Sequence, residues 1–283
     1  MEGEPSRTAI ATAVARGRHR LHDDPPWVLD DPFALSLAGP IWRLVERRAL
    51  KYYPPPVDRA YRAGIVLRSR YTEDRLVERR FAQYVLLGAG LDAFVWRRPD
   101  VVRTLRVFEV DHPESQRAKR ERATELALPE PPDVVYVPVD FEVDALADRL
   151  DDAGIDWSSP TLFSWLGVTM YLSLPAIDLA LRTVARCTPG SEIVFTYAPA
   201  RTTLDDVGRQ FDEIAGRFAA EAGEPMVTYL SRPEVERVVE RAGLEVAAHP
   251  HREELVSRYF STRGDALEPF TAESLLAARV PLP

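Results

Sequence analysis

Short apolar runs separated by helical segments dominate the chain from Gln83 onward. The runs cover residues 84–87, 106–110, 134–139, 161–166 and 192–197. Helices are predicted between them at 113–126, 144–152 and 175–187, the last followed by a Thr-Pro-Gly turn. Buried strands that alternate with helices are typical of βαβ units, so this pattern predicts an α/β fold with a mostly parallel sheet and helices on both faces.

The chain before this region has a different pattern, with helical stretches broken by turn-forming residues. Prolines at 25–26 and 54–56 are expected to stop helices. One helix is predicted to open at Asp31-Pro32-Phe33-Ala34, and a longer one covers 57–79, where apolar side chains recur at helical spacing.

Beyond the fifth run, residues 201–229 look like an insertion, followed by a predicted helix at 233–242 and a possible strand at 244–248. We therefore predict an N-terminal helical cap over residues 1–81 and an α/β core over 82–283, with a lid near 201–229. The cap is expected to contribute to the binding site of the core.

A glycine-rich turn directly follows the first apolar run, in the sequence Gly88-Ala89-Gly90-Leu91-Asp92. Glycines let the backbone approach a ligand closely, and Asp111, about twenty residues later, ends the next strand with a carboxylate that can accept hydrogen bonds from a ribose diol. Together they predict a pocket for an adenosine-type cofactor. A tight turn followed by an ordinary helix-capping acid is the plainer alternative.

Two classes of cofactor enzyme fit this pocket. Gly88, Gly90 and Ala93 satisfy the looser dinucleotide fingerprint, which favours an NAD(P)-dependent oxidoreductase. An S-adenosylmethionine enzyme is instead favoured by Asp92 within the turn and by Asp140, which closes the third strand. A scaffold that binds the cofactor without catalysis is a third possibility.

The composition of the chain further limits the functions and locations that we expect. The chain has 283 residues and a formal charge of -8, which argues against broad nucleic-acid binding. It has no long uncharged apolar stretch and no secretory pattern at its acidic start, and Cys187 is its single cysteine. We therefore expect a cytoplasmic protein without a membrane or nucleic-acid partner.

Several segments in a fixed order resemble the leucine carboxyl methyltransferase family of class I S-adenosylmethionine-dependent methyltransferases. They are 68–71, the glycine turn with its continuation to 97, 108–113, 137–141 and 165–172. The resemblance implies a Rossmann-like methyltransferase core and S-adenosyl-L-methionine as the cofactor. It also implies O-methylation of a carboxylate on a small molecule or peptide.

The resemblance also implies roles for individual residues. Arg68 would hold the cofactor carboxylate, a contact suited to the guanidinium group. Gly88 and Gly90 would lie under the methionine part, Asp92 would be a further cofactor-binding residue of the turn, and Asp111 would take the ribose hydroxyls. Asp140 and Phe141 would frame adenine. A surface arginine and a helix-capping acid are the plainer interpretations of Arg68 and Asp140.

The chain departs from the family pattern at one position of the expected site. Leu166 stands where the family usually carries Glu, so a polar contact near the methionine end of the cofactor is missing. At Phe94, bacterial relatives often have Arg. Trp165 and Gly167 keep the surrounding pattern, which indicates a variant of the family.

The expected acceptor site lies at the carboxyl ends of the fourth and fifth strands, where open α/β sheets bind ligands. Tyr171, Tyr197 and Arg201 are the candidates for substrate binding, although tyrosines are also common in cores. An ionised carboxylate needs no general base, so no catalytic side chain is assigned. His19 and His22 are expected at the surface, and the pair His249 and His251 does not amount to a metal site.

Overall fold

The computed structural model describes residues 6–141, 143–221 and 223–283. The chain starts with four helices, α1 (Arg7–His22), α2 (Ala34–Ala38), α3 (Trp42–Tyr52) and α4 (Pro55–Glu78). Asp31 caps α2, because its Oδ1 accepts from the amides of Phe33 (3.1 Å) and Ala34 (3.0 Å). No helix in these ranges is both long and apolar enough to cross a membrane.

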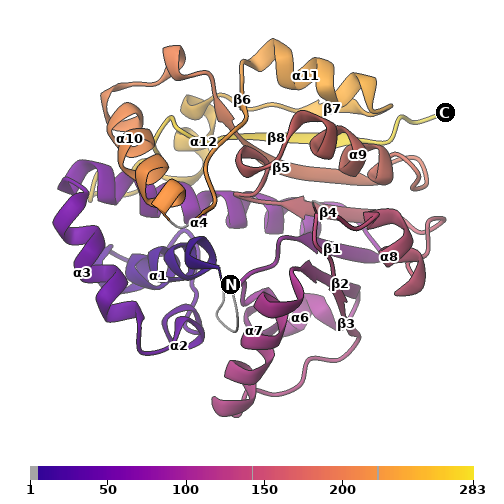
Figure 1. The fold of residues 1–283 in the computed structure, drawn as a ribbon, viewed down its shortest axis with the longest axis horizontal. Helices are drawn as coiled ribbons and strands as arrows, with labels where there is room; N and C mark the ends of the chain where they lie inside the picture. Colours follow the sequence, from indigo (N-terminus) through magenta and orange to yellow (C-terminus); the bar gives the residue numbers. More distant parts are fainter. Residues whose placement is uncertain (1–5, 142, 222) are drawn as a thin grey trace.

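The predicted parallel strands lie side by side in one large sheet and include one of its edges (Figure 1). They are β1 (Gln83–Leu87), β2 (Arg106–Asp111), β3 (Val134–Pro138), β4 (Thr161–Trp165) and β5 (Glu192–Pro199). The strand order is β3-β2-β1-β4-β5-β8-β7, with the short β6 (Tyr229–Leu230) paired to β5. The strands β1 to β5 pair in parallel, so their carboxyl ends share one edge of the sheet.

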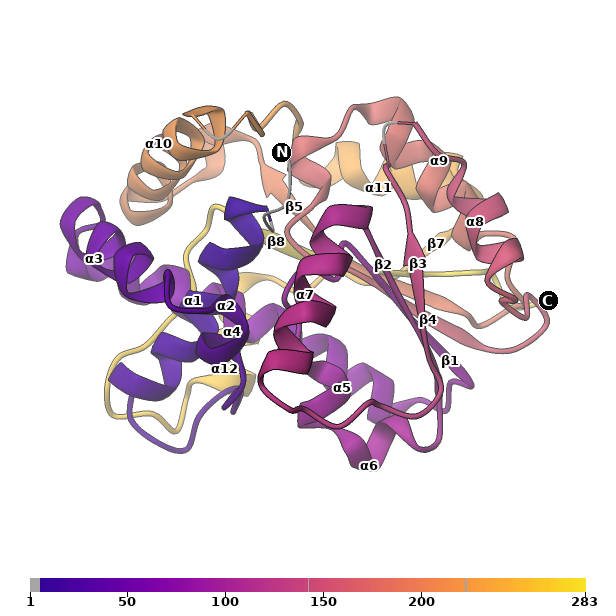
Figure 2. The same cartoon turned by 60° about the horizontal axis from the view of Figure 1, so that its bottom comes forward.

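Helices cover both faces of the sheet, which confirms the predicted fold class (Figure 2). One face packs against α8 (Leu146–Asp152), α9 (Leu174–Val184) and α11 (Arg232–Arg241). The other packs against α4, α5 (Phe94–Arg97) and α12 (Arg252–Tyr259). The short α6 (Pro99–Val102) follows α5, and α7 (Pro113–Glu125) joins β2 to β3.

The last quarter of the chain differs from the sequence prediction. The pattern predicts no element after residue 248, yet α12 and the strand β8 (Ser274–Arg279) lie there. Strand β8 runs antiparallel between β5 and β7 (Glu245–Ala248). Its residues 275–278 are all buried, because helices cover both faces of the sheet at this strand. It therefore shows no alternation of polar and apolar residues.

The N-terminal helices share their core with the sheet. Ala63, Val66 and Leu67 of α4 belong to the same hydrophobic cluster as Tyr84 and Leu86 of β1. Buried ion pairs reinforce the contact, among them Arg75 to Glu192, with Nη2 and Oε2 2.6 Å apart. The helices thus hold their side chains in fixed positions at the edge of the sheet.

His19 corrects one sequence prediction. It was expected at the surface because it lies among arginines, but it is completely buried. Its Nδ1 lies 2.9 Å from Asp23 Oδ2, and its Nε2 accepts from the amide of Val28. A buried carboxylate partner makes this position possible.

Candidate functional site

The glycine turn lies at the carboxyl end of β1 and is held by backbone hydrogen bonds. The amides of Gly88 and Ala89 donate to the carbonyl of Val110, at 2.8 and 3.0 Å. A Cβ atom on Gly88 would lie 2.5 Å from Cγ2 of Val168, so a larger residue would push the loop after β4 away. The two loops can meet only because this residue is glycine.

Asp92 closes the turn. Its Oδ1 accepts from the amide of Phe94 at 2.6 Å and starts the short helix α5. Burial alone would raise the pKa of Asp92, but the charges of Arg16, Arg97 and Lys119 outweigh it and lower the pKa. The carboxylate is therefore ionised and fixes the turn, which is consistent with its predicted place beside the cofactor.

Asp111 ends β2 next to this turn. Its Oδ2 accepts from the amide of Gly90 at 2.5 Å, and its Oδ1 accepts from the amide of His112 at 2.7 Å. Burial raises the pKa of Asp111 against the lowering effect of these two bonds. Each carboxylate oxygen has a second lone pair, so the group can still accept from ribose hydroxyls.

Asp140 and Phe141 lie where β3 ends. The amide of Val139 donates to the carbonyl of Asp111 at 2.9 Å, which brings the ends of β2 and β3 together. The ring of Phe141 packs on Trp165 at the end of β4, with centroids 6.2 Å apart. An apolar wall and an acid therefore lie beside Asp111, a combination that suits an adenine base.

Arg68 reaches the site from the middle of α4. Its Nη1 lies 2.7 Å from Oε1 of Glu273, and both side chains are about nine-tenths buried, at 10% and 9% exposed. The guanidinium lies against Gly167, where a Cβ atom would lie 2.5 Å from Nη1. Leu166 is half-buried and packs on the α4 side of the sheet. Sequence reasoning missed Glu273, because nothing marks it as the partner of a residue 205 positions earlier.

Tyr171 follows β4 in a 3-10 turn (Thr169–Tyr171), shortly after Gly167 and Val168, which contact Arg68 and Gly88. Burial raises the pKa of the phenols of Tyr171 and Tyr61, that of Tyr61 to about 12. In the described part of the chain, neither hydroxyl forms a hydrogen bond. Two phenolic donors are thus free, Tyr61 about two helical turns before Arg68 on α4 and Tyr171 after the loop that contacts Arg68.

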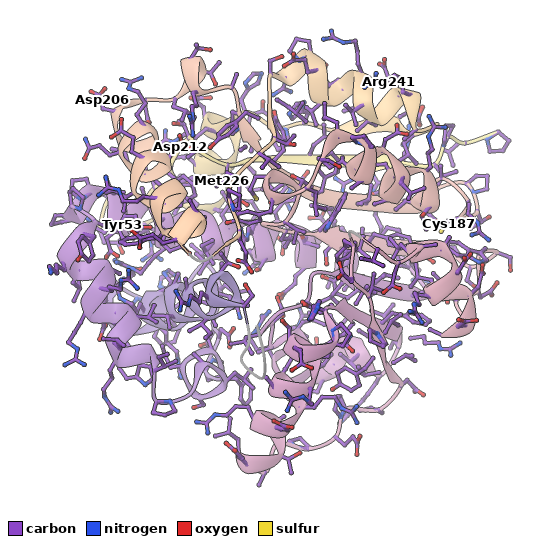
Figure 3. The ribbon with its side chains drawn as sticks, in the orientation of Figure 1. Tyr53, Cys187, Asp206, Asp212, Met226 and Arg241 are labelled. Atoms are coloured by element: carbon purple, nitrogen blue, oxygen red, sulfur yellow. The ribbon has the colours of Figure 1, made fainter. Side chains whose placement is uncertain are left out.

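Aromatic rings extend from Tyr61 toward the lid. Tyr61 stacks on Phe211 of α10 (Asp206–Glu221) with centroids 5.1 Å apart, and Phe211 contacts Phe270 at 4.5 Å. Tyr53, labelled in Figure 3, stacks on both Tyr61 and Phe211. Figure 3 shows Tyr53, Asp212 and Met226 on the side where α10 approaches the N-terminal helices, far from Cys187. The predicted lid therefore packs on the cap above the carboxyl edge.

Helix α1 lies over the glycine turn. Arg16 donates from Nη2 to the carbonyl of Leu91 at 2.6 Å, and Ala9 lies against Gly90. The first turn of α1 is tied to the lid, because Ser6 and Thr8 donate to Oε2 of Glu224 at 3.2 and 2.9 Å. The start of α1 and Glu224 of the segment 201–229 are thus held together next to the glycine turn.

The structure gives the two other predicted substrate residues different partners. The hydroxyl of Tyr197 lies 2.9 Å from Nε2 of His249, whose Nδ1 lies 2.8 Å from Glu236, and Tyr197 packs in the core with α9 and α11. Arg201 is mostly exposed and pairs with Asp212 at 2.7 Å. Tyr197 and Arg201 thus already have side-chain partners, whereas Tyr171 follows the loop that contacts Arg68. Among the described residues, no group of three His, Cys, Asp or Glu is arranged to hold a metal ion.

The strand order and the site together define the structural class of this protein. The dinucleotide-binding fold has six parallel strands in the order 3-2-1-4-5-6. Here an antiparallel strand lies between β5 and β7, and the glycine turn, Asp111, Asp140 and Phe141 lie at the carboxyl edge. This arrangement belongs to an adenosine-cofactor α/β protein of the Rossmann-like kind, and it speaks against the oxidoreductase alternative.

Comparison with known proteins identifies the family. The family description "Leucine carboxyl methyltransferase" matches residues 9–185, more than half of the chain. The chain belongs to this family, as its motifs predicted. The family also confirms S-adenosyl-L-methionine as the predicted cofactor.

Two relatives illustrate the similarity. A Bacillus subtilis protein named "Putative S-adenosyl-L-methionine-dependent methyltransferase YktD" is 35% identical over 66% of this chain and 62% of its own length, so the match spans less than two thirds of that relative. A Mycolicibacterium gilvum protein named "Putative S-adenosyl-L-methionine-dependent methyltransferase" is 30% identical over 89% of this chain and 86% of its own length.

Solved structures agree on the fold. A DUF574 family protein from Streptomyces avermitilis superposes with a TM-score of 0.62 at 17% identity, over 99% of each chain. A protein from Thermobifida fusca, described as a "putative methyltransferase", gives 0.62 at 16% identity over 99% of this chain and 97% of its own. The similarity confirms the Rossmann-like fold class.

Proposed function

We propose that this protein transfers the methyl group of S-adenosyl-L-methionine to a carboxylate oxygen of a small molecule or peptide. The carboxylate oxygen attacks the methyl carbon, the bond from that carbon to sulfur breaks, and the electron pair stays on sulfur. The products are a methyl ester and S-adenosylhomocysteine. No proton moves in this step, and the chain needs no catalytic base.

The cofactor supplies an activated methyl group on its positively charged sulfur. The residues present fit it: Arg68 offers a guanidinium for its carboxylate, and Asp111 offers a carboxylate for its ribose hydroxyls. Asp140 and Phe141 offer an acid and a ring for its adenine. The tight contact of Gly88 with Val168 keeps the turn free of side chains beside the methionine part.

The observation that carries the choice of a carboxylate is the pair of phenols Tyr61 and Tyr171. Burial raises the pKa of each, so both stay protonated at neutral pH. A protonated phenol donates a hydrogen bond to an anionic oxygen but cannot take a proton from an alcohol. Two such donors suit an acceptor that arrives already ionised.

The cap and the lid exclude water from this step. Helix α1 lies over the glycine turn, and its first turn is tied to the lid through Glu224. The lid is also anchored to the loop after β4, because the amide of Val227 donates to the carbonyl of Met170 at 2.8 Å. Exclusion of water strengthens the hold on a charged acceptor. We further expect a cytoplasmic location, which the buried Cys187 fits.

The chemical stability of the product tests this proposal. The purified protein is incubated with S-adenosylmethionine labelled on the methyl group and a panel of carboxylic acids, each paired with the corresponding primary alcohol. We expect label transfer to acids only. Mild base should release the label as volatile methanol, because it hydrolyses methyl esters but not methyl ethers.

Substitutions test whether the residues of the candidate site bind the acceptor. Tyr171→Phe should raise KM for the acid about tenfold or more, since a hydrogen bond to a charged oxygen is lost, and leave cofactor affinity unchanged. Tyr52→Phe is the matched control, because Tyr52 is 42% exposed on α3. A base-stable product, or transfer to the alcohols, would show that the acceptor is not a carboxylate.

A further inference from the structure

The ion pair between Arg68 and Glu273 stands out because it is buried without a clear structural purpose. Both side chains are about nine-tenths buried and the two atoms are 2.7 Å apart. Removing two charges from water costs free energy that their attraction barely repays, so such a pair is weak evidence of stabilisation. In the described part of the chain, Glu273 has no hydrogen-bond partner besides Arg68.

One short loop after β4 contacts both the ion pair and the glycine turn. Gly167 contacts the Arg68 guanidinium, since a Cβ atom there would lie 2.5 Å from Nη1 and 2.8 Å from Nη2. Val168, the next residue, contacts Gly88 in the same way. Two consecutive residues after β4 thus touch the ion pair and the glycine turn, so the pair lies where the methionine part of the cofactor passes.

The charges of this pair match those of the methionine part. That part carries an α-carboxylate and an α-ammonium group on one carbon atom, so a site needs a cation and an anion close together. Arg68 supplies only the cation. Leu166, the nearby position where the family pattern has an acid, supplies no charge. Glu273 is a buried carboxylate in direct contact with Arg68.

We propose that Glu273 binds the α-ammonium group of the cofactor while Arg68 binds its α-carboxylate. This inference rests on the cofactor assigned to the family and deepens the proposed function by adding a binding residue. The acid then comes from the start of β8 instead of the end of β4. Four alternating charges replace the two of the empty pair, which satisfies the remaining lone pairs of Glu273 and donors of Arg68.

A purely positioning role for Glu273 makes a different prediction. If Glu273 only holds Arg68 in place, its loss weakens every ligand that has the α-carboxylate. If Glu273 binds the ammonium group, its loss weakens only ligands that have that group. The comparison therefore needs S-adenosylhomocysteine and an analogue that lacks only the α-amino group.

Calorimetric titration of both ligands into the wild-type protein and Glu273→Gln tests the proposal. The wild-type protein should bind S-adenosylhomocysteine about tenfold or more tightly than the analogue, as expected for a hydrogen bond to a charged group. Glu273→Gln should lose that preference, with weaker binding of S-adenosylhomocysteine and unchanged binding of the analogue. Glu268→Gln, a mostly exposed carboxylate on the same segment, should behave as wild type.

Each contrary result has a distinct meaning. Equal loss for both ligands in Glu273→Gln, or no loss for either, would overturn the proposal. Equal affinity of the wild-type protein for the two ligands would overturn it without any variant, so the test does not depend on the variant folding. Failure of the wild-type protein to bind S-adenosylhomocysteine at all would refute the cofactor itself, and the inference with it.

Discussion

Substitution of Gly167 by alanine should lower both the cofactor affinity and the free energy of unfolding, and the two effects can be measured separately. Gly167 has a φ of +75°, a left-handed conformation that costs an alanine about 1–2 kcal/mol. The new Cβ atom would also lie 2.5 Å from Nη1 and 2.9 Å from Cζ of Arg68, closer than such atoms approach. The guanidinium must therefore move, and its contact with Glu273 must change.

The displaced guanidinium should lose its contact with the cofactor carboxylate. A hydrogen bond to a charged group contributes about 1.5–3 kcal/mol, so Gly167→Ala should bind S-adenosylhomocysteine about tenfold or more weakly. Its free energy of unfolding should fall by at least the ~1–2 kcal/mol of backbone strain. Calorimetry and urea unfolding measure the two effects separately.

Gly243→Ala is the matched control. Gly243 has a φ of +86°, and a Cβ atom there would meet only Cβ of Ala185, at 3.8 Å. This variant should lose similar backbone stability and keep full affinity for S-adenosylhomocysteine. If Gly167→Ala binds the ligand as tightly as Gly243→Ala does, Arg68 does not hold the cofactor from this position.

Three further predictions concern other parts of the molecule. Asp111→Asn should bind S-adenosylhomocysteine ~1 to 3 kcal/mol more weakly in calorimetry, because an acceptor for the ribose hydroxyls becomes a donor; unchanged affinity would remove Asp111 from the site. Tyr61→Phe should raise KM for the acceptor in steady-state assays and leave cofactor affinity unchanged; a fall in cofactor affinity alone would contradict the assignment of its hydroxyl to the acceptor. Burial lowers the pKa of His249 against the opposing effect of its hydrogen bond to Glu236, so the unfolded chain binds a proton at His249 more readily than the folded one. The stability that neutral His249 contributes is therefore complete above about pH 6.5 and declines as the pH falls below it. His249→Gln should flatten this decline in the free energy of unfolding, measured with urea between pH 7 and 5. An identical decline in the variant would show that other groups cause it.

Local patterns in the sequence were sufficient to predict the parallel strands of the sheet. Each of the first five strands is an apolar run next to a turn or helix signal, and each was predicted within two residues of its ends. The strand β8 was not predicted, because it pairs with β5 across more than seventy residues and carries no alternation. Its position decides the strand order, and with it the distinction from a dinucleotide-binding fold.

The candidate site likewise contains residues that local sequence patterns predict and residues that only the folded structure brings together. Gly88, Gly90 and Asp111 follow strands at fixed spacing, so their meeting at one edge could be predicted. Arg68 required the family resemblance, because its helix precedes the sheet. Glu273 could not be predicted, since its only signal is a contact with Arg68 in the folded chain. Tyr61 was missed for the same reason, because its role depends on Tyr171 and on the lid.

Parallel calorimetric titration of the purified protein with S-adenosylmethionine, S-adenosylhomocysteine and NADH tests the central claim most directly. The geometry of the glycine turn, Asp111 and Arg68 predicts micromolar binding of the first two and no heat from NADH. Binding of NADH without S-adenosylhomocysteine would contradict the site, and absence of binding by all three would show that the chain is a scaffold without its cofactor.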